Sequence, residues 1–340
     1  MHMVDALLSP GTGAAMWAAS AGAAVYATKK ITGSGMSEKK LPVMAVSGAF
    51  VFAAQMINFT IPGTGSSGHI GGGIMLAGLL GEFPAFLTLA AVLLIQCLFF
   101  ADGGLLAWGA NVFNMAVIPC LIVYPLVMRP LLRKGITKAK LAGSSLLASV
   151  IGLQLGAFGV VLETQLSGIT ELPFAAFAAL MQPVHLAIGV VEGFVTAAVL
   201  GFVWRLRPEL IEAPLQREKL RREIPVKKVT VLLAIAAVVI GGVVSLAASS
   251  NPDGLEWSME HTAGTSELKA ENGIYSLVSG IQDKLAFLPD YDFSDGEGNG
   301  TSLSGVVGAA LTALLALGIG GGITVVKKRK RRESYGGHEK

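Results

Sequence analysis

The sequence is poor in charged residues. Only 14% of its 340 residues are Asp, Glu, Lys or Arg, whereas 52% are hydrophobic and the mean hydropathy is +0.62. A soluble domain carries roughly 25% charged residues, so we expect a protein that lies largely within a membrane. Cysteine is also scarce. Cys97 and Cys120 both lie within apolar runs, which favours buried free thiols over a disulfide or a metal site.

Motifs of several enzyme classes are absent. The chain has no HExxH, GxSxG or Walker sequence. The stretch "IPGTGSSGHIGGG" has the glycines of a phosphate-binding loop but lacks its Gly-Lys-Ser/Thr ending, which disfavours nucleotide binding. No basic residue precedes Lys29, so the opening "MHMVDALLSP" does not fit a signal peptide and is expected to be a functional part of the protein. We expect no catalytic site, no resident cofactor and no nucleic-acid partner.

Nine apolar runs are candidates for membrane spans, because a span needs about 20 mostly apolar residues. They lie near residues 12–28, 42–60, 69–81, 84–101, 111–128, 141–163, 174–204, 229–249 and 304–326. The third is short and rich in glycine, which predicts a tilted or partly broken span. The seventh is overlong and contains Pro183, which favours a short helix before the spanning one. The expected fold class is an all-α polytopic membrane protein.

The basic residues indicate how these spans are oriented. Of the 26 Lys and Arg residues, all but Lys269 and Lys284 fall on one side of the membrane by this assignment. The positive-inside rule then predicts a cytoplasmic C-terminus and an outer N-terminus in a prokaryotic cytoplasmic membrane. We divide the chain into a seven-span core (1–204), a cytoplasmic linker (205–228), a two-span module (229–326) with an acidic outer segment (250–303), and a basic cytoplasmic tail (327–340). The outer segment is too short for a core of its own and is expected to fold against the membrane part.

The N-terminus has the donor groups of a metal chelate. A free Met1 amine, the His2 amide and the His2 Nδ1 are three nitrogens in sequence, which close a five-membered and a six-membered ring around one metal ion. A fourth nitrogen would complete a square-planar set that suits Ni(II) or Cu(II). His69, in the glycine-rich outer loop, lies on the same predicted side of the membrane. A histidine at position two can equally be an ordinary polar residue.

Further polar side chains lie in or near the predicted spans: Asp102, Asn111, Asn114, His185 and Glu192. His185 and Glu192 are seven residues apart and share a helix face, which indicates an intramembrane polar cluster. Asn111 and Asn114 are three apart at an outer helix end, where they could orient the ligands or serve the helix end itself. His261 lies in the acidic outer segment, and His338 in the charged tail is expected to be solvated.

Four separated stretches resemble a known family. "MHMVDALLSP", "PGTGSSGHIGGG", "FADGGLLAWGANVFNMAV" and "HLAIGVVEGFVTAAVL" are similar to the CbiM/NikM-type substrate-capture (S) components of nickel and cobalt energy-coupling-factor (ECF) ABC transporters. The resemblance covers about residues 1–210. The outer segment "NPDGLEWS" resembles the PDGLE motif of the small NikN-type subunit, here fused through the linker.

The resemblance implies a membrane capture protein rather than an enzyme. It implies a metal site made by the Met1 amine, the His2 backbone and side chain, and a second histidine, which the match to "GHIGGG" places at His69. It also implies a transmembrane coupling (T) protein and two cytoplasmic ATPase subunits as partners, with Ni(II) or Co(II) as the transported substrate. The square-planar set and the PDGLE segment favour nickel, with cobalt as the alternative.

Three other classes compete with this interpretation. A purely structural or assembly subunit would not need the Met1–His2 arrangement. An ion-coupled secondary transporter would show an internal repeat and ionisable residues at the membrane midplane; Glu192 is a weak candidate and no repeat is visible. A membrane metalloenzyme would need an acid or base beside its metal, and the sequence shows no such motif.

Overall fold

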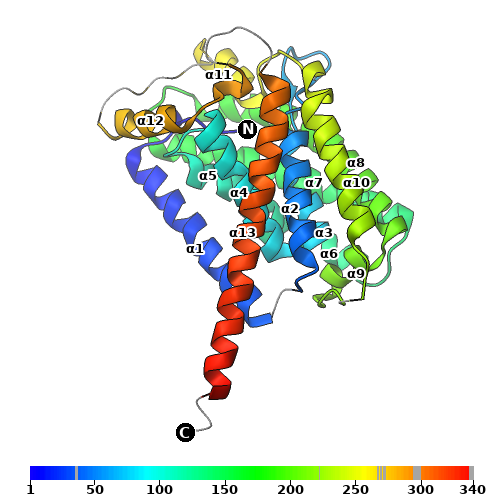
Figure 1. The fold of residues 1–340 in the computed structure, drawn as a ribbon. Helices are drawn as coiled ribbons and strands as arrows, with labels where there is room; N and C mark the ends of the chain where they lie inside the picture. Colours follow the sequence, from blue (N-terminus) through cyan, green and yellow to red (C-terminus); the bar gives the residue numbers. More distant parts are fainter. Residues whose placement is uncertain are drawn as a thin grey trace.

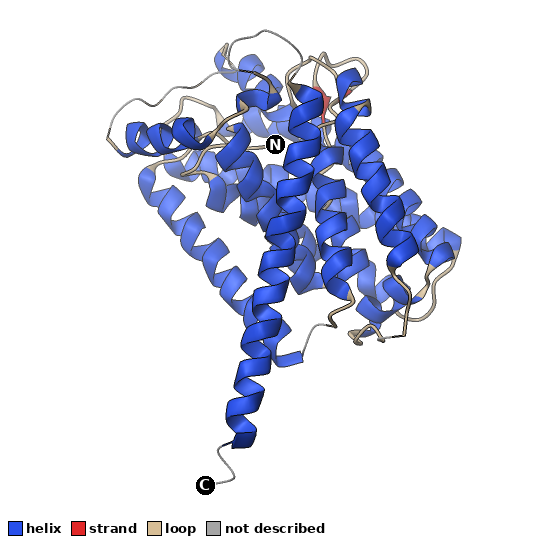
Figure 2. Cartoon of the chain, in the orientation of Figure 1, coloured by secondary structure: helices blue, strands red, loops and turns tan. Residues whose placement is uncertain are grey.

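The computed structural model describes residues 1–34, 37–221, 223–265, 268, 270, 273–293 and 300–336. Helices make up nearly all of this part of the chain (Figure 2). They are α1 (Pro10–Ser34), α2 (Lys40–Gln55), α3 (Gly73–Leu80), α4 (Glu82–Phe100), α5 (Trp108–Val112), η2 (Phe113–Met128), α6 (Arg129–Leu132), α7 (Lys138–Ser167), α8 (Phe174–Leu206), α9 (Glu209–Gln216), α10 (Lys227–Gly242), α11 (Gly254–Ala263), α12 (Ile274–Leu285) and α13 (Thr301–Gly336). Short 3-10 turns are η1 (Asp5–Leu7), η3 (Val244–Ala247) and η4 (Pro289–Tyr291). The predicted all-α fold is confirmed.

Among the described residues, five helical stretches are long and apolar enough to cross a membrane: Glu82–Phe100, Trp108–Leu132, Lys138–Ser167, Phe174–Leu206 and Thr301–Lys327. The third predicted span contains only the eight residues of α3, too few to cross a bilayer, after an extended glycine-rich stretch. The predicted total of nine spans, with seven in the core, stays a prediction.

The helix break expected near Pro183 is wrong. α8 continues through this residue as one helix from Phe174 to Leu206. Proline is tolerated in a membrane helix where neighbouring groups satisfy the backbone. Here Gln154 of α7 donates from Nε2 to the Gln182 carbonyl at 2.8 Å, and Gln182 donates back to the Gln154 carbonyl at 3.4 Å. These two bonds join α7 to α8 beside the proline.

The fifth span has an unusual backbone. Its central part, η2, is π-helical and contains Pro119 and Pro125. A Cβ at Gly73 would lie 2.5 Å from Cγ of Pro119, so the start of α3 reaches the proline ring only because Gly73 has no side chain. Cys120 donates from Sγ to the Gly73 carbonyl at 3.4 Å. Both cysteines are buried and free, as predicted.

The two-span module packs directly on the core. α13 crosses the front of the molecule beside α2, and α10 lies on the other side of α2 (Figure 1). A Cβ at Gly308 would lie 2.0 Å from Cζ of Phe52, so the aromatic ring of α2 fits against the bare backbone of α13. Gly241 and Gly305 allow α10 and α13 an equally close approach.

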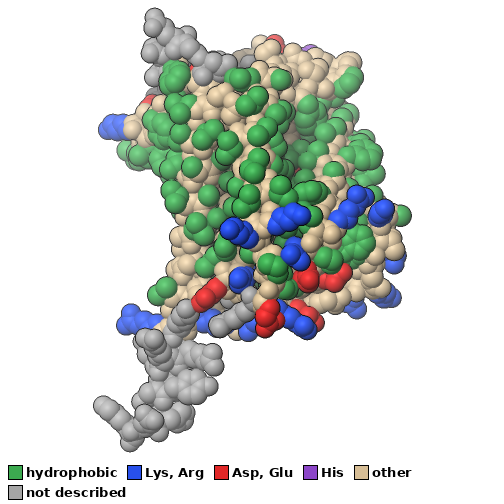
Figure 3. All heavy atoms as spheres, turned by 45° about the vertical axis from the view of Figure 1, so that its right-hand side comes forward, with side chains coloured by type: hydrophobic (Ala, Val, Ile, Leu, Met, Phe, Trp, Pro, Cys, Tyr) green, Lys and Arg blue, Asp and Glu red, His purple; other side chains and the backbone are tan. Residues whose placement is uncertain are grey.

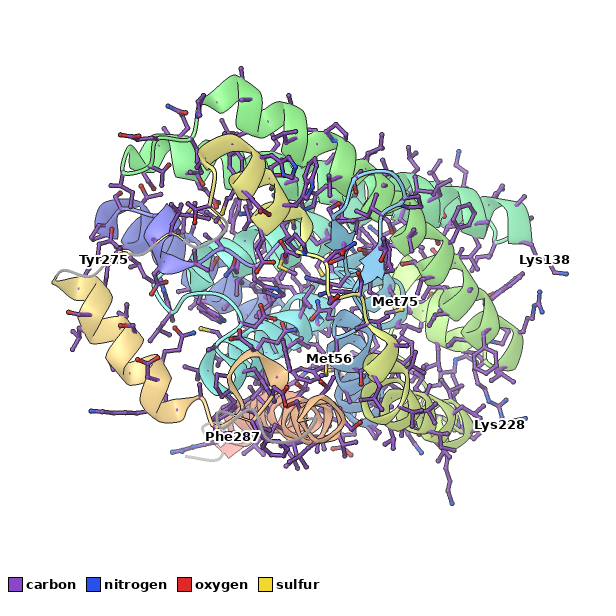
Figure 4. The ribbon with its side chains drawn as sticks, turned by 90° about the horizontal axis from the view of Figure 1, so that it is seen from above. Met56, Met75, Lys138, Lys228, Tyr275 and Phe287 are labelled. Atoms are coloured by element: carbon purple, nitrogen blue, oxygen red, sulfur yellow. The ribbon has the colours of Figure 1, made fainter. Side chains whose placement is uncertain are left out.

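The two ends of the molecule differ in charge. Lys and Arg side chains gather at the end from which α13 projects, below a broad apolar surface (Figure 3). The N-terminus lies at the opposite end, beneath α11 (Figure 1). Seen from above, Tyr275 and Phe287 mark the two ends of α12 along the rim, whereas Met56 and Met75 lie centrally (Figure 4). The described part of the outer segment therefore covers the end that holds the N-terminus.

Candidate metal centre

The first residues form an extended segment that runs into the protein interior. The Met3 amide donates to Oδ1 of Asn111 at 2.7 Å, and Nδ2 of Asn111 donates back to the Met3 carbonyl at 3.1 Å. The Gly104 amide donates to the same carbonyl at 2.9 Å. A Cβ at Gly103, whose φ is +82°, would lie 2.8 Å from Asn111 Nδ2 and 3.3 Å from the His2 Cβ. Asn111 and the loop between α4 and α5 thus fix the position of the N-terminal segment through hydrogen bonds to Met3.

His2 and His69 meet in the interior. Their rings stack with centroids 5.1 Å apart and an interplanar angle of 19°. His2 Nδ1 lies 3.1 Å from Oδ1 of Asp102, and its buried Nε2 has no partner within the described structure. Burial, followed by the positive charge of the chain's first amine, lowers the pKa of His2 to about 3. His2 is therefore a neutral imidazole whose Nδ1 faces Asp102.

His69 has the complementary arrangement. Its Nδ1 lies 3.0 Å from the Ile70 carbonyl. Because a carbonyl oxygen only accepts, Nδ1 carries the proton and Nε2 keeps its lone pair. This is the tautomer in which a histidine serves as a metal ligand through Nε2.

Asp102 is itself fixed by the outer segment. The Tyr291 hydroxyl donates to Oδ2 of Asp102 at 2.5 Å, while Oδ1 faces His2. Burial is the main cause that raises the pKa of Asp102 above its usual value. The two oxygens thus link η4 of the outer segment to the His2 ring.

The Met1 amine pairs with a carboxylate from far along the chain. It lies 2.5 Å from Oδ2 of Asp253, and the Met1 side chain is buried. Asp253 also caps α11: its Oδ1 accepts from the amides of Leu255 and Glu256, and Glu256 completes a capping box. Burial raises the pKa of Asp253, but the ammonium group of Met1 prevails and holds it below the usual range. The carboxylate is therefore ionised and orients the amine.

Backbone contacts join the Asp253 segment to the glycine-rich loop. Ser67, in the short strand β2 (Ser67–Gly68), donates its amide to the Pro252 carbonyl at 2.8 Å and its hydroxyl to the Asn251 carbonyl at 2.7 Å. β2 pairs antiparallel with β1 (Phe59–Thr60). These bonds place Asp253 beside the loop that carries His69.

Glu192 holds the other end of the glycine-rich loop. Its Oε2 accepts from the Gly71 amide at 2.7 Å and its Oε1 from the Gly72 amide at 3.2 Å. Gln55 donates from Nε2 to the Gly71 carbonyl at 2.9 Å, and Gln96 donates to Oε1 of Gln55. Gly72 has a φ of +76°, a conformation that favours glycine. Buried side chains of α2, α4 and α8 thus set the path of the backbone that follows His69.

His185 lies under the Asp253 segment. A Cβ at Gly254 would lie 3.1 Å from Cε1 of His185 and 2.6 Å from Cγ1 of Val184, so the absence of a side chain lets α11 approach α8. His185 places Nδ1 2.8 Å from the Met181 carbonyl, and its buried Nε2 has no partner within the described structure. A cavity of about 10 Å³ borders Met1, His69 and His185. That volume suits a single water molecule or ion.

Of the remaining polar residues singled out from the sequence, Asn114 lines a small cavity together with Met1 and Glu192. Asn114 donates from Nδ2 to Oε2 of Glu163 at 2.7 Å. His261 is exposed on α11, with Nδ1 2.8 Å from the Trp257 carbonyl of its own helix. His338 lies outside the described residues.

Several residues of the site were missed from the sequence: Asp253, Gln55, Gln96 and Tyr291. The two amides are isolated polar residues within apolar runs, which is a usable signal. Asp253 lies within the quoted PDGLE motif, which was a usable signal as well, whereas Tyr291 in the acidic outer segment carries none. Within the described residues, no group of three or more His, Cys, Asp or Glu side chains is arranged to hold a metal ion.

Comparisons with known proteins agree with this organisation. Residues 2–210 match the family described as "CbiM: Cobalt uptake substrate-specific transmembrane region", and residues 227–324 match the PDGLE domain. The putative fused nickel transport protein NikMN of Archaeoglobus fulgidus is 31% identical over 94% of this chain and 97% of its own length. The fused nickel transport protein NikMN of Rhodobacter capsulatus is 31% identical over 97% of this chain and 99% of its own.

A solved structure covers the N-terminal part. The crystal structure of a truncated transition metal transporter is 32% identical, with a TM-score of 0.53 over 61% of this chain and 99% of that one. Three features of the structure agree with these matches. They are the helical N-terminal part, the paired histidines at its buried N-terminus and the PDGLE segment that packs above them. The chain belongs to the CbiM family of cobalt uptake substrate-specific transmembrane proteins, and it carries a C-terminal PDGLE domain.

Proposed function

We propose that this chain is the substrate-specific component of an ECF-type, ATP-driven importer that captures Ni(II) at its outer side. The observation that carries the proposal is the convergence of the Met1 amine, His2 and His69 in one buried cluster at the end opposite the basic residues. Membership of a family of nickel and cobalt transport proteins supports the substrate class.

The ligands we propose are the Met1 amine, the His2 amide nitrogen, His2 Nδ1 and His69 Nε2. Two of them have other partners in this structure: the amine faces Asp253 and Nδ1 faces Asp102. Coordination therefore requires the amine to lose its proton, and the His2 ring to turn from Asp102 and shift its own proton. His69 Nε2 is already in its ligating tautomer.

The surrounding residues would position these ligands without binding the metal. Asn111 holds the strand at Met3, Asp102 orients the His2 ring, and Glu192 holds the loop beyond His69. His185 borders the small cavity, and its Nε2 is the fifth ligand that we propose for a metal ion that binds more than four donors. Asn114 is assigned to helix packing through Glu163.

Nickel is favoured over cobalt on the chemistry of the donors. A set of one amine, one amide and two imidazole nitrogens around one ion suits the square-planar geometry of Ni(II). The relatives that share both parts of this chain are named as nickel transport proteins. Relatives named as cobalt transport proteins match about the first two thirds of this chain, and cobalt is the second candidate.

Transport by this chain would require partners. The sequence has no nucleotide-binding motif, so we assign ATP hydrolysis to two cytoplasmic ATPase subunits and the coupling of that energy to a transmembrane T protein. The proposed orientation places the metal centre outside and the basic end in the cytoplasm. We also propose the boundaries given above for the core, linker, two-span module and tail.

Calorimetric titration of the purified, untagged chain with Ni(II) and Co(II) tests the proposal. His2→Ala and His69→Ala are each expected to weaken binding by at least about a hundredfold, because each removes a donor from a chelate. His261→Ala is the matched control, since this histidine is exposed on the same side and bonds only to its own helix. Binding by either variant as tight as that of the control would remove that histidine from the site. Uptake into vesicles that lack the ATPase subunits would instead support an ion-coupled transporter.

A further inference from the structure

A second cavity lies at the opposite end of the molecule from the metal centre. It encloses about 350 Å³, within the roughly 300–1,000 Å³ typical of small-molecule sites. The end of α1, the start of α2, the turn between α3 and α4, and the end of α9 form its walls. Nothing in the proposed capture of a metal at the outer end uses this cavity.

The cavity is lined by more positive than negative side chains. Its cations are Lys30, Lys40, Arg217 and Lys219, and its acids are Glu82 and Glu218. Arg217 and Glu82 neutralise each other through an ion pair of 2.8 Å. Lys30 lies over the Tyr26 ring, with Nζ 5.3 Å from its centroid. Even without Lys30, Lys40 and Lys219 outnumber Glu218, so the cavity attracts an anion.

The Lys40 ammonium group is held in place at the cavity by a backbone carbonyl. Its Nζ donates to the Leu80 carbonyl at 3.1 Å, which anchors the side chain across the α3–α4 turn. An ammonium group has three N–H donors, and this carbonyl is the acceptor found for it within the described structure. Because Lys40 lines the cavity, its two other donors are left for an acceptor that binds there.

The rest of the lining is apolar. Ile31, Leu80, Phe83 and Pro84 lie on the same walls as the lysines, and the rings of Tyr26 and Phe83 meet edge to face at 5.7 Å. Tyr26 and its neighbour Val25 are more than half exposed on α1. An inorganic ion would use only the charged part of such a site, whereas an amphiphile would use both parts.

The position of the cavity agrees with an amphiphile. Its lining combines lysines of the predicted cytoplasmic side with the exposed Tyr26 of α1, as expected at the level at which lipid headgroups contact a membrane protein. Basic pockets between membrane helices on the cytoplasmic side recurrently hold anionic headgroups. We propose that this cavity binds the phosphate headgroup of an anionic phospholipid, with Lys40 and Lys219 on the phosphate and the aromatic pair beside the acyl chains. A bound lipid would join α1 to α2 and α9.

Thermal unfolding of the full chain in neutral detergent tests this proposal. Phosphatidylglycerol is expected to raise Tm in a saturable way, whereas phosphatidylcholine and inorganic phosphate are not. Lys40→Gln combined with Lys219→Gln is expected to weaken the apparent lipid affinity at least about tenfold, since each basic residue adds to anionic lipid binding. The matched control is Lys138→Gln with Lys140→Gln, two exposed lysines at the start of α7 outside the cavity.

Because loss of the Lys40 bond to Leu80 can itself destabilise the protein, Lys219→Glu is the second variant. Lys219 is exposed, and reversing its charge should lower lipid affinity without unfolding the chain. Nickel affinity is expected to be unchanged in Lys219→Glu. A failure of the lipid proposal can therefore be distinguished from a failure of the proposed metal site.

Three results would overturn the lipid assignment. An equal shift with inorganic phosphate would make the cavity a free-anion site, and an equal shift with phosphatidylcholine would remove the role of charge. An unchanged response to phosphatidylglycerol in both variants would place the lipid elsewhere. If lipid has no effect and the variants instead lose co-purification with co-expressed ATPase and T subunits, the cavity is a docking surface for a partner protein.

Discussion

Replacing Glu192 by Gln tests how the path of the glycine-rich loop determines metal affinity. Both carboxylate oxygens of Glu192 accept backbone amides, from Gly71 at 2.7 Å and from Gly72 at 3.2 Å. A glutamine has the same shape, but it has only one oxygen. Its NH2 group would face a backbone N–H, which leaves a buried donor without an acceptor.

The cost follows from these two bonds. A hydrogen bond to a charged group contributes about 1.5–3 kcal/mol, and an unsatisfied buried donor costs about 1–3 kcal/mol, so the exchange should cost about 2.5–6 kcal/mol in all. If this cost fell entirely on the metal-bound state, nickel would bind roughly 60- to 20,000-fold more weakly. Part of it will appear as a lower Tm, because the loop is also ordered in the free protein.

The assay is calorimetric titration with Ni(II), paired with thermal unfolding in the same detergent. Glu163→Gln is the control, because it also replaces a buried carboxylate, but one that accepts a single side-chain amide from Asn114. The glutamine oxygen can keep that bond, so nickel affinity should change little. If Glu192→Gln binds nickel with wild-type affinity and melts at the wild-type temperature, the loop does not depend on these bonds. Equal losses in both variants would show only that a buried carboxylate was removed.

Three further outcomes are expected. Acetylating Met1, or extending the chain before it, should weaken nickel binding as much as His2→Ala does, measured by titration before and after a cleavable extension is removed; unchanged affinity would exclude the amine as a ligand. Deleting residues 227–340 should lower Tm, because it exposes the face of α2 around Phe52, yet leave measurable nickel binding; complete loss of binding in a folded truncation would place a ligand in the PDGLE part. Gly254→Val should displace α11 and cost about 1–3 kcal/mol, because a Cβ there meets Val184 at 2.6 Å; unchanged protease resistance of the outer segment would refute that contact.

Properties that depend on runs of residues were predictable from the sequence. The apolar stretches and the low charge determine that the chain is a helical membrane protein, because a bilayer selects helices of sufficient length and low charge wherever they occur in the chain. The gathering of Lys and Arg at one end of the molecule follows from the same linear pattern. The convergence of His2 and His69 was anticipated through local motifs, and the structure brings their rings together.

Pairings between distant polar groups were decided by the tertiary structure. The Asp253 carboxylate lies beside the Met1 amine, and Tyr291 beside Asp102, across most of the chain length. Neither the composition nor the spacing of the outer segment identifies these partners. The continuity of α8 at Pro183 is likewise a property that the sequence pattern did not predict. The physical reason is that lipid solubility is a sum over consecutive residues, whereas a buried donor or charge is stabilised only by a particular acceptor brought within about 3 Å, and folding alone determines which one that is.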